Sequence, residues 1–168
     1  MNIALIGMSG VGKSIIGKEL AKKLNYKFLD IDEVIEKKTK LKLQQIIDNF
    51  GDKELLKIEE KTILELDELD RYIISPGGSI IYSEKAMEFL KKNSIVIFLN
   101  ASLESIKKRV LDFSNRGIIG LKKKGLEMLF IERQSLNEKY ADIIMKMPEE
   151  FDIKSIVKNI INKIKRRS

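Results

Sequence analysis

Short, uninterrupted apolar runs alternate with amphipathic stretches along most of the chain. Runs without polar alternation are typical of strands buried on both faces, whereas apolar residues three and four positions apart are typical of helices. Strands are therefore expected at residues 3–6, 27–29, 72–74, 95–99 and 141–145. Because strands and helices alternate, we expect a three-layer α/β/α fold with a five-stranded parallel sheet.

Helical spacing predicts the outer layers of this fold. The expected helices cover residues 13–24, 43–69 with a break near Gly51, 84–92, 102–111, 126–136 and 151–164. In the region 43–69, apolar stripes that include Phe50 and Leu55 indicate two helices inserted between the second and third strands. We expect them to cover the site as a substrate lobe over about residues 32–69.

The apolar pattern weakens between residues 112 and 125. This stretch holds three glycines, Arg116 and the lysine triplet 122–124. A cationic loop of this length in a compact domain is often a mobile lid, and an ordinary surface loop is the alternative. No linker or repeat divides residues 1–168, so we expect one domain. Its core would comprise residues 1–31, 70–111 and 140–168.

The most specific motif follows the first strand, where residues 7–14 read Gly-Met-Ser-Gly-Val-Gly-Lys-Ser. A strand, a glycine-rich turn and a helix in this order form a phosphate-binding loop, because backbone N–H groups and the helix dipole attract an anion. Lys13 can reach the outer phosphates of a nucleoside triphosphate, and the Ser14 hydroxyl can bind Mg²⁺. A turn that merely connects strand to helix is the alternative. The expected nucleotide-binding residues of the loop are Ser9, Gly10, Val11, Gly12, Lys13, Ser14 and Ile15.

Two carboxylates, Asp30 and Asp32, follow the second strand. In extended backbone, residues i and i+2 share a face, so both can point toward the phosphate loop, one for Mg²⁺ and one for the substrate. Asp30 with Glu33 also resembles a helix capping box. Capping leaves Asp32 free, so the two interpretations are compatible.

A Pro-Gly-Gly-Ser turn at residues 76–79 ends the third strand. Such a turn lets the backbone approach a ligand closely, and a connector without a ligand is the alternative. The chain contains neither Cys nor His. Disulfides and thiolate zinc sites are therefore excluded, and a general base has to be a carboxylate, Lys or Tyr.

The net charge of +7 allows two interpretations. Lysines are mixed with Asp and Glu along most expected helices, which is typical of solvated surface, and only residues 122–124 and 163–167 concentrate positive charge. We therefore expect an anionic small-molecule partner and no nucleic acid. The N-terminus runs directly into the first strand, and no apolar stretch reaches the roughly 18 residues of a membrane span. A cytoplasmic monomer with no membrane partner is expected.

The placed motifs resemble those of the shikimate kinases, P-loop enzymes related to nucleoside-monophosphate kinases, over nearly the whole chain. The resemblance is carried by the phosphate loop, Leu-Asp-Ile-Asp at 29–32, Gly51 with the helix after it, the turn at 76–79, Arg109, Arg116 and Arg133. It implies a P-loop kinase fold with a helical substrate lobe and a lid. It also implies that ATP and Mg²⁺ serve the transfer of a phosphoryl group to a hydroxyl, converting shikimate to shikimate 3-phosphate.

The same resemblance assigns roles to individual residues. Asp30 would support Mg²⁺ together with Ser14, and Asp32 would act as the base on the accepting hydroxyl. Arg109 would lie at the nucleotide, and Arg116 would meet the transferring phosphoryl group beside Lys13. The remaining substrate contacts would come from Gly77, Gly78, Ser79 and Arg133, the last of which would hold the substrate carboxylate.

Four departures fall mainly in the acceptor half of the site. Leu56 stands where the family has an Arg that pairs with the shikimate carboxylate, and Lys57 points about 100° away on a helix. Losing one charge-assisted hydrogen bond should weaken a carboxylate substrate about 10- to 150-fold. Ser79 replaces a third glycine, Gly117 follows the lid arginine in place of Pro, and Asn137 replaces a usual Tyr.

These departures leave three alternatives to shikimate phosphorylation open. The acceptor could be another hydroxylated metabolite, such as a polyol or a hydroxy acid. A slow nucleotide-dependent switch is a second alternative, although residues 99–102 do not supply the Asn-Lys-x-Asp motif that reads guanine. A nucleic-acid phosphotransferase is the third, and only the net charge favours it.

Overall fold

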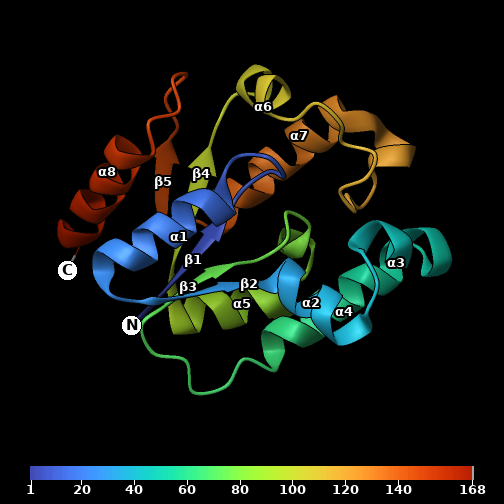
Figure 1. Ribbon diagram of the computed structural model, residues 1–168, viewed down its shortest axis with the longest axis horizontal. Coiled ribbons are helices and arrows are strands. Elements are labelled where there is room, and N and C mark those ends of the chain that lie inside the picture. The colour runs from blue at the N-terminus through green and yellow to red at the C-terminus, as the bar shows by residue number, and fades with distance from the viewer. Residues whose placement is uncertain (168) are drawn as a thin grey trace.

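A computed structural model describes residues 1–167 as a five-stranded parallel sheet covered by helices on both faces (Figure 1). The strands are β1 (Asn2–Ile6), β2 (Lys27–Asp30), β3 (Tyr72–Ser75), β4 (Ser94–Asn100) and β5 (Ile143–Lys146). Their order across the sheet is β2-β3-β1-β4-β5, and every neighbouring pair is parallel. The predicted three-layer α/β/α architecture is confirmed, with β1 at its centre.

The helices are α1 (Lys13–Leu24), α2 (Ile31–Thr39), α3 (Leu43–Phe50), α4 (Asp52–Leu64), α5 (Glu84–Asn93), α6 (Leu103–Arg109), α7 (Leu121–Tyr140) and α8 (Ile153–Lys165), with a 3₁₀ turn, η1, at Ile80–Tyr82. Helices α1 and α8 pack together on one face of the sheet, and α5 lies against the other (Figure 1). Helices α2, α3 and α4 extend beyond the end of β2 (Figure 1), and their apolar side chains join the core cluster on the α5 side of the sheet.

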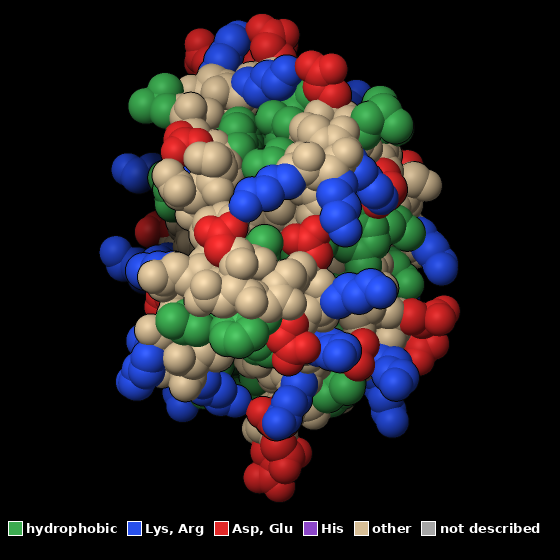
Figure 2. Space-filling model, turned by 90° about the vertical axis from the view of Figure 1, so that its right-hand side faces the viewer, with side chains coloured by type: hydrophobic (Ala, Val, Ile, Leu, Met, Phe, Trp, Pro, Cys, Tyr) green, Lys and Arg blue, Asp and Glu red, His purple; other side chains and the backbone are tan. Residues whose placement is uncertain are grey.

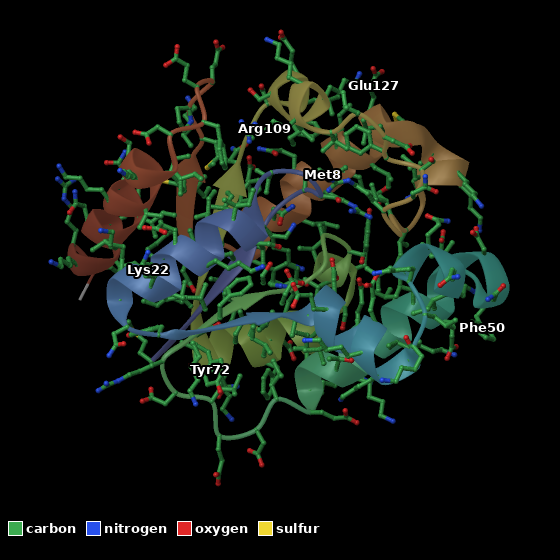
Figure 3. All side chains as sticks on the ribbon, in the orientation of Figure 1. Met8, Lys22, Phe50, Tyr72, Arg109 and Glu127 are labelled. Carbon is green, nitrogen blue, oxygen red and sulfur yellow. The ribbon has the colours of Figure 1, made fainter. Side chains whose placement is uncertain are left out.

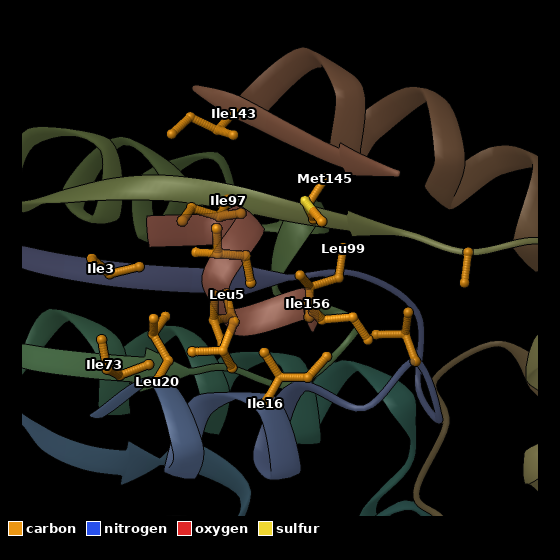
Figure 4. Close-up of a cluster of buried hydrophobic side chains, with 14 of the residues drawn as sticks. Ile3, Leu5, Ile16, Leu20, Ile73, Ile97, Leu99, Ile143, Met145 and Ile156 are labelled. Carbon is orange, nitrogen blue, oxygen red and sulfur yellow. The ribbon is translucent and has the colours of Figure 1, made fainter. Parts of the chain in front are cut away.

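The side chains of β1 point alternately to the two faces of the sheet, and the core is accordingly divided into two clusters. Ile3 and Leu5 face α1 and α8, whereas Ala4 and Ile6 face α4 and α5. Figure 4 shows the first cluster closing between the sheet and these two helices. Because β1 is fully buried on both faces, the loop that follows it is anchored on a strand at the centre of the core.

The structure corrects several sequence-based boundaries. Three helices, not two, separate β2 from β3, because Asp30 caps a further helix, α2. Helix α4 ends at Leu64, well before the predicted residue 69. Phe50 does not join an apolar stripe, since 62% of its surface is exposed and it lies at the outer end of α3 (Figure 3).

The lid region is also more helical than its pattern indicates. Helix α7 begins at Leu121, so the lysine triplet 122–124 is helical, and only Gly125 has non-helical angles (φ 74°, ψ 165°). This break shifts the helical phase, which is why the periodic pattern starts only after it. Within residues 1–167, no helix combines the length and the apolar character needed to cross a bilayer.

Candidate active site

The phosphate loop joins β1 to α1 at the carboxyl edge of the sheet. Gly10 (φ 86°) and Gly12 (φ 105°) adopt angles that other residues rarely tolerate, and they curl the backbone around an anion-sized space. No side chain caps α1, so its first N–H groups are available to a phosphate. Lys13 Nζ donates to the carbonyls of Gly7 (2.9 Å) and Met8 (3.2 Å), and burial lowers its pKa to about 8.

A cavity of about 470 Å³ opens over this loop. Its walls are Ser9, Gly10, Gly12, Lys13, Ser14, Ile15, Asp32, Ser75, Gly78, Arg109, Val110, Arg116 and Phe151. Nearly all the predicted nucleotide residues therefore come together. Val11 is the exception, because its side chain is fully buried in the core and only its carbonyl contributes, accepting a bond from Arg109 Nη1 (3.2 Å).

Arg109 and Phe151 form one end of the large cavity. The guanidinium of Arg109 lies 4.5 Å from the centre of the Phe151 ring, and its Nη2 is buried without a partner. The ring also packs against Gly12, where an added Cβ would lie 2.7 Å from Phe151 Cζ. Phe151 could not be predicted as a site residue, because the loop between β5 and α8 carries no motif that points to the phosphate loop.

Ser14 and Asp30 meet at the base of the loop. The Ser14 hydroxyl donates to Asp30 Oδ2 over 2.6 Å, while Asp30 Oδ1 accepts from the backbone N–H of Asp32 (3.1 Å). Asp30 is therefore a helix cap, but its bond goes to the N–H of Asp32 and not to that of Glu33 as in a capping box, and its other oxygen still lies beside Ser14. A hydroxyl and a carboxylate oxygen this close fit a Mg²⁺ ion that shares its coordination with phosphates and water.

A second, much smaller cavity of about 20 Å³ adjoins the first. It is lined by Ser9, Asp32, Leu43, Glu59, Gly77, Gly78, Ser79, Arg116, Gly117, Ile118 and Arg133. Asp32 lies on the boundary between the two cavities and faces both. Its buried Oδ1 has no partner, and burial raises the pKa of this carboxyl to about 6 against the opposing charge of Lys13.

Glu59 is a buried carboxyl that the site prediction missed. Its Oε2 accepts a 2.5 Å bond from the Ser79 hydroxyl, and burial raises its pKa to about 8. Gly77 separates it from Asp32, since an added Cβ there would lie 2.4 Å from Glu59 Oε1 and 3.0 Å from Asp32 Oδ1. Its spacing from Leu55 and Ile63 would have placed it on the buried face of α4.

Two arginines supply positive charge to the small cavity. Arg133 is only 2% exposed, donates from Nη2 to the carbonyl of Ile119 (2.9 Å) and keeps Nε free of any protein partner. Its guanidinium also lies 5.4 Å from the centre of the Tyr82 ring. Arg116 comes from the lid, and its exposed side chain lines both cavities. Of the predicted arginines, Arg116 lines both cavities, whereas Arg109 lines the large cavity and Arg133 lines the small one.

Leu56 and Asn137, which differ from the shikimate kinase pattern, make different contacts in the structure. Leu56 is half-buried against the apolar cluster that includes Ile46, Leu55 and Ile63, and it lines neither cavity. Asn137 lies one turn behind Arg133 and donates to the Arg133 carbonyl over 2.7 Å. Neither residue replaces the missing cation.

Comparisons with known proteins agree with this geometry. A family model described as shikimate kinase matches residues 9–165. The shikimate kinase of Sulfurihydrogenibium sp. is 34% identical over 166 residues, covering 99% of each chain. A shikimate kinase from Acinetobacter baumannii in complex with shikimate superposes with a TM-score of 0.91 at 27% identity, covering 99% of this chain and 94% of that one. The Aquifex aeolicus enzyme gives a TM-score of 0.84 at 31% identity, with 98% and 96% covered.

Proposed function

The chain belongs to the shikimate kinase family, and from that premise we propose that it transfers the γ-phosphoryl group of ATP to the 3-hydroxyl of shikimate. The observation that carries this proposal is Asp32, whose unpartnered buried oxygen lies where the nucleotide cavity meets the acceptor cavity. In the reaction the hydroxyl oxygen bonds to the γ-phosphorus, the bond to the ADP oxygen breaks, and Asp32 takes the hydroxyl proton.

The nucleotide half of the site orients ATP. The backbone N–H groups of residues 9–15 surround the phosphates, and Lys13 turns from its loop carbonyls toward the outer phosphates. Arg116 lies at the junction of the cavities, where charge accumulates during transfer. Mg²⁺, held by Ser14 and Asp30, would neutralise phosphate charge when bound.

The acceptor half holds an anionic substrate. Arg133 contributes a buried guanidinium with a free Nε, which suits a carboxylate. Gly77 and Gly78 let the acceptor approach the backbone closely, because side chains there would meet Glu59, Asp32 or Arg133. We assign the lobe at residues 32–69 to acceptor binding and residues 112–125 to a lid.

The test is release of ADP in the presence of shikimate, with gluconate and homoserine as comparison acceptors. We expect shikimate to stimulate release most strongly and Asp32→Asn to reduce it by on the order of 10²- to 10⁴-fold. The matched control is Glu33→Gln, which neutralises the exposed next residue on α2. If millimolar shikimate did not stimulate ADP release while another acceptor did, the assignment of the substrate would be overturned.

A further inference from the structure

Two backbone N–H groups of the lid are hydrogen-bonded to side chains of the substrate lobe. The N–H of Gly117 donates to Gln44 Oε1 on α3 (3.2 Å), and the N–H of Gly120 donates to Asp52 Oδ2 on α4 (3.0 Å). Beyond them, Lys122 Nζ lies 2.8 Å from Asp48 Oδ1. Three separate side chains of the lobe therefore hold one short stretch of the lid.

The side chain of Gln44 is itself held in place. Its Nε2 donates to Asp48 Oδ1 over 3.0 Å, which leaves Oε1 turned toward the lid. Asp48 also accepts from Lys122, so the lobe and the lid share this carboxylate. An amide fixed at both ends loses less side-chain entropy when the lid docks than a free glutamine would lose.

Gly117 is shaped for this contact. Its φ of 64° lies in the left-handed region, and an added Cβ would lie 2.3 Å from Leu43 Cβ on α3. A proline could neither adopt this angle nor donate the N–H that Gln44 accepts. The glycine after Arg116 is therefore required by the docked backbone and is not a flexible connector.

Burial divides the lid at Arg116. Residues 117–119 are buried, and Ile118 and Ile119 are only 6% and 8% exposed, whereas residues 112 and 114–116 are exposed and Phe113 is half-buried. Ile118 joins the cluster on the α1 side of the sheet, and Ile119 joins the cluster on the α5 side. Arg116 is thus the last residue of the exposed arm, directly before the docked segment.

We propose that Gln44 and Asp52 are positioning residues for phosphoryl transfer, which dock the lid backbone on the substrate lobe and so hold Arg116 at the junction of the two cavities. This inference rests on the proposed function for the role of Arg116, but docking itself does not depend on which acceptor is used. The face concerned, viewed in Figure 2, carries Lys, Arg, Asp and Glu side chains interspersed over the lid and α3.

Hydrogen–deuterium exchange of residues 112–121 in the free protein tests the docking directly. We expect Gln44→Ala to speed exchange of the Gly117 amide about 2- to 12-fold, the range for one neutral hydrogen bond. We expect Asp52→Ala to speed exchange of the Gly120 amide about 10- to 150-fold, the range for one hydrogen bond to a carboxylate. Trypsin should also cleave the bond after Arg116 faster in both variants. The matched control is Asn49→Ala, an exposed amide on the same helix as Gln44.

Kinetics then separate positioning from simple destabilisation. In Gln44→Ala and Asp52→Ala, kcat should fall by about the factor by which amide exchange speeds up, while the KM for ATP stays within about twofold. Asp52→Asn should recover most of the lost kcat, because its amide oxygen still accepts a hydrogen bond. Exchange and cleavage rates equal to those of Asn49→Ala would overturn the docking. Faster exchange with unchanged kcat would overturn the positioning role. Because exchange is measured without an acceptor, the exchange result on lid docking would stand even if the substrate assignment were wrong.

Discussion

The nucleotide and acceptor halves of the site are built in different ways. The nucleotide half is an open cavity of about 470 Å³ whose floor is the contiguous loop 9–15. The acceptor half is about 20 Å³ and is assembled from α2, α4, the turn 77–79, the lid and α7. A loop that binds phosphate through its own backbone needs little help from the rest of the chain, whereas a specific small-molecule pocket needs side chains from many elements.

The two halves also differ in their charged groups. The nucleotide half buries one cation, Lys13, and burial lowers its pKa to about 8. The acceptor half buries Arg133 together with two carboxyls, and burial raises the pKa of Asp32 to about 6 and that of Glu59 to about 8. Near pH 7, Asp32 is therefore mostly ionised and able to accept a proton, while Glu59 is mostly neutral and does not repel an anionic substrate.

The largest effect is expected from a substitution in the nucleotide half of the site. Lys13→Met removes the buried charge while keeping an unbranched side chain, and we expect turnover to fall by on the order of 10²- to 10³-fold, as for loss of one transition-state donor. The same variant should lose much of the thermal stabilisation that ATP gives. Lys18→Met, on the exposed face of α1, is the control. Unchanged turnover would mean that the loop binds nucleotide without assisting transfer.

A second substitution tests whether a cation on α4 would strengthen binding in the acceptor half of the site. Leu56→Arg restores a cation on α4, and we expect the KM for shikimate to fall about 10- to 150-fold if the new guanidinium reaches the carboxylate. Lys57→Arg, on the exposed neighbouring position, should leave the KM unchanged. Steady-state kinetics against shikimate measures both variants. An unaltered KM in Leu56→Arg would show that position 56 lies outside the reach of the carboxylate.

The pH dependence of kcat/KM for the acceptor tests the electrostatic difference. Asp32 has to be ionised to accept the proton, so the rate should fall below about pH 6 and be roughly tenfold lower at pH 5. Above about pH 8, ionisation of Glu59 and loss of the Lys13 charge should lower it again. Glu59→Gln should retain the acid limb, because that limb belongs to Asp32. A flat profile between pH 5 and 7 would contradict Asp32 as the base.

The smallest expected effect concerns the far end of the nucleotide cavity. Phe151→Ala removes the ring that stacks on Arg109, and we expect the KM for ATP to rise about 2- to 12-fold, the range given by one aromatic contact. The KM for the acceptor should not change, since Phe151 lines only the large cavity. Phe151→Tyr keeps the ring and is the control. An equal change in both KM values would mean that the ring supports the whole fold.

The phosphate loop and the succession of strands and helices along the chain could be predicted because their signals are local. A glycine-rich turn between a buried strand and a helix fixes its own backbone geometry, and Ser14 and Asp30 lie within hydrogen-bond distance of each other beside it. The alternation of buried strands and amphipathic helices likewise predicted a parallel three-layer sheet.

What only the tertiary structure decided was which distant side chains meet. Glu59 pairs with Ser79, Phe151 stacks on Arg109, and Gln44 accepts from Gly117, and each pair is separated by at least twenty positions in the chain. The sequence pattern marks a residue as buried or exposed, but it does not specify the partner that burial brings, because helix packing and loop docking set those distances. The local sequence thus determines the shape of the phosphate loop, and long-range packing determines how residues 117–120 dock on α3 and α4.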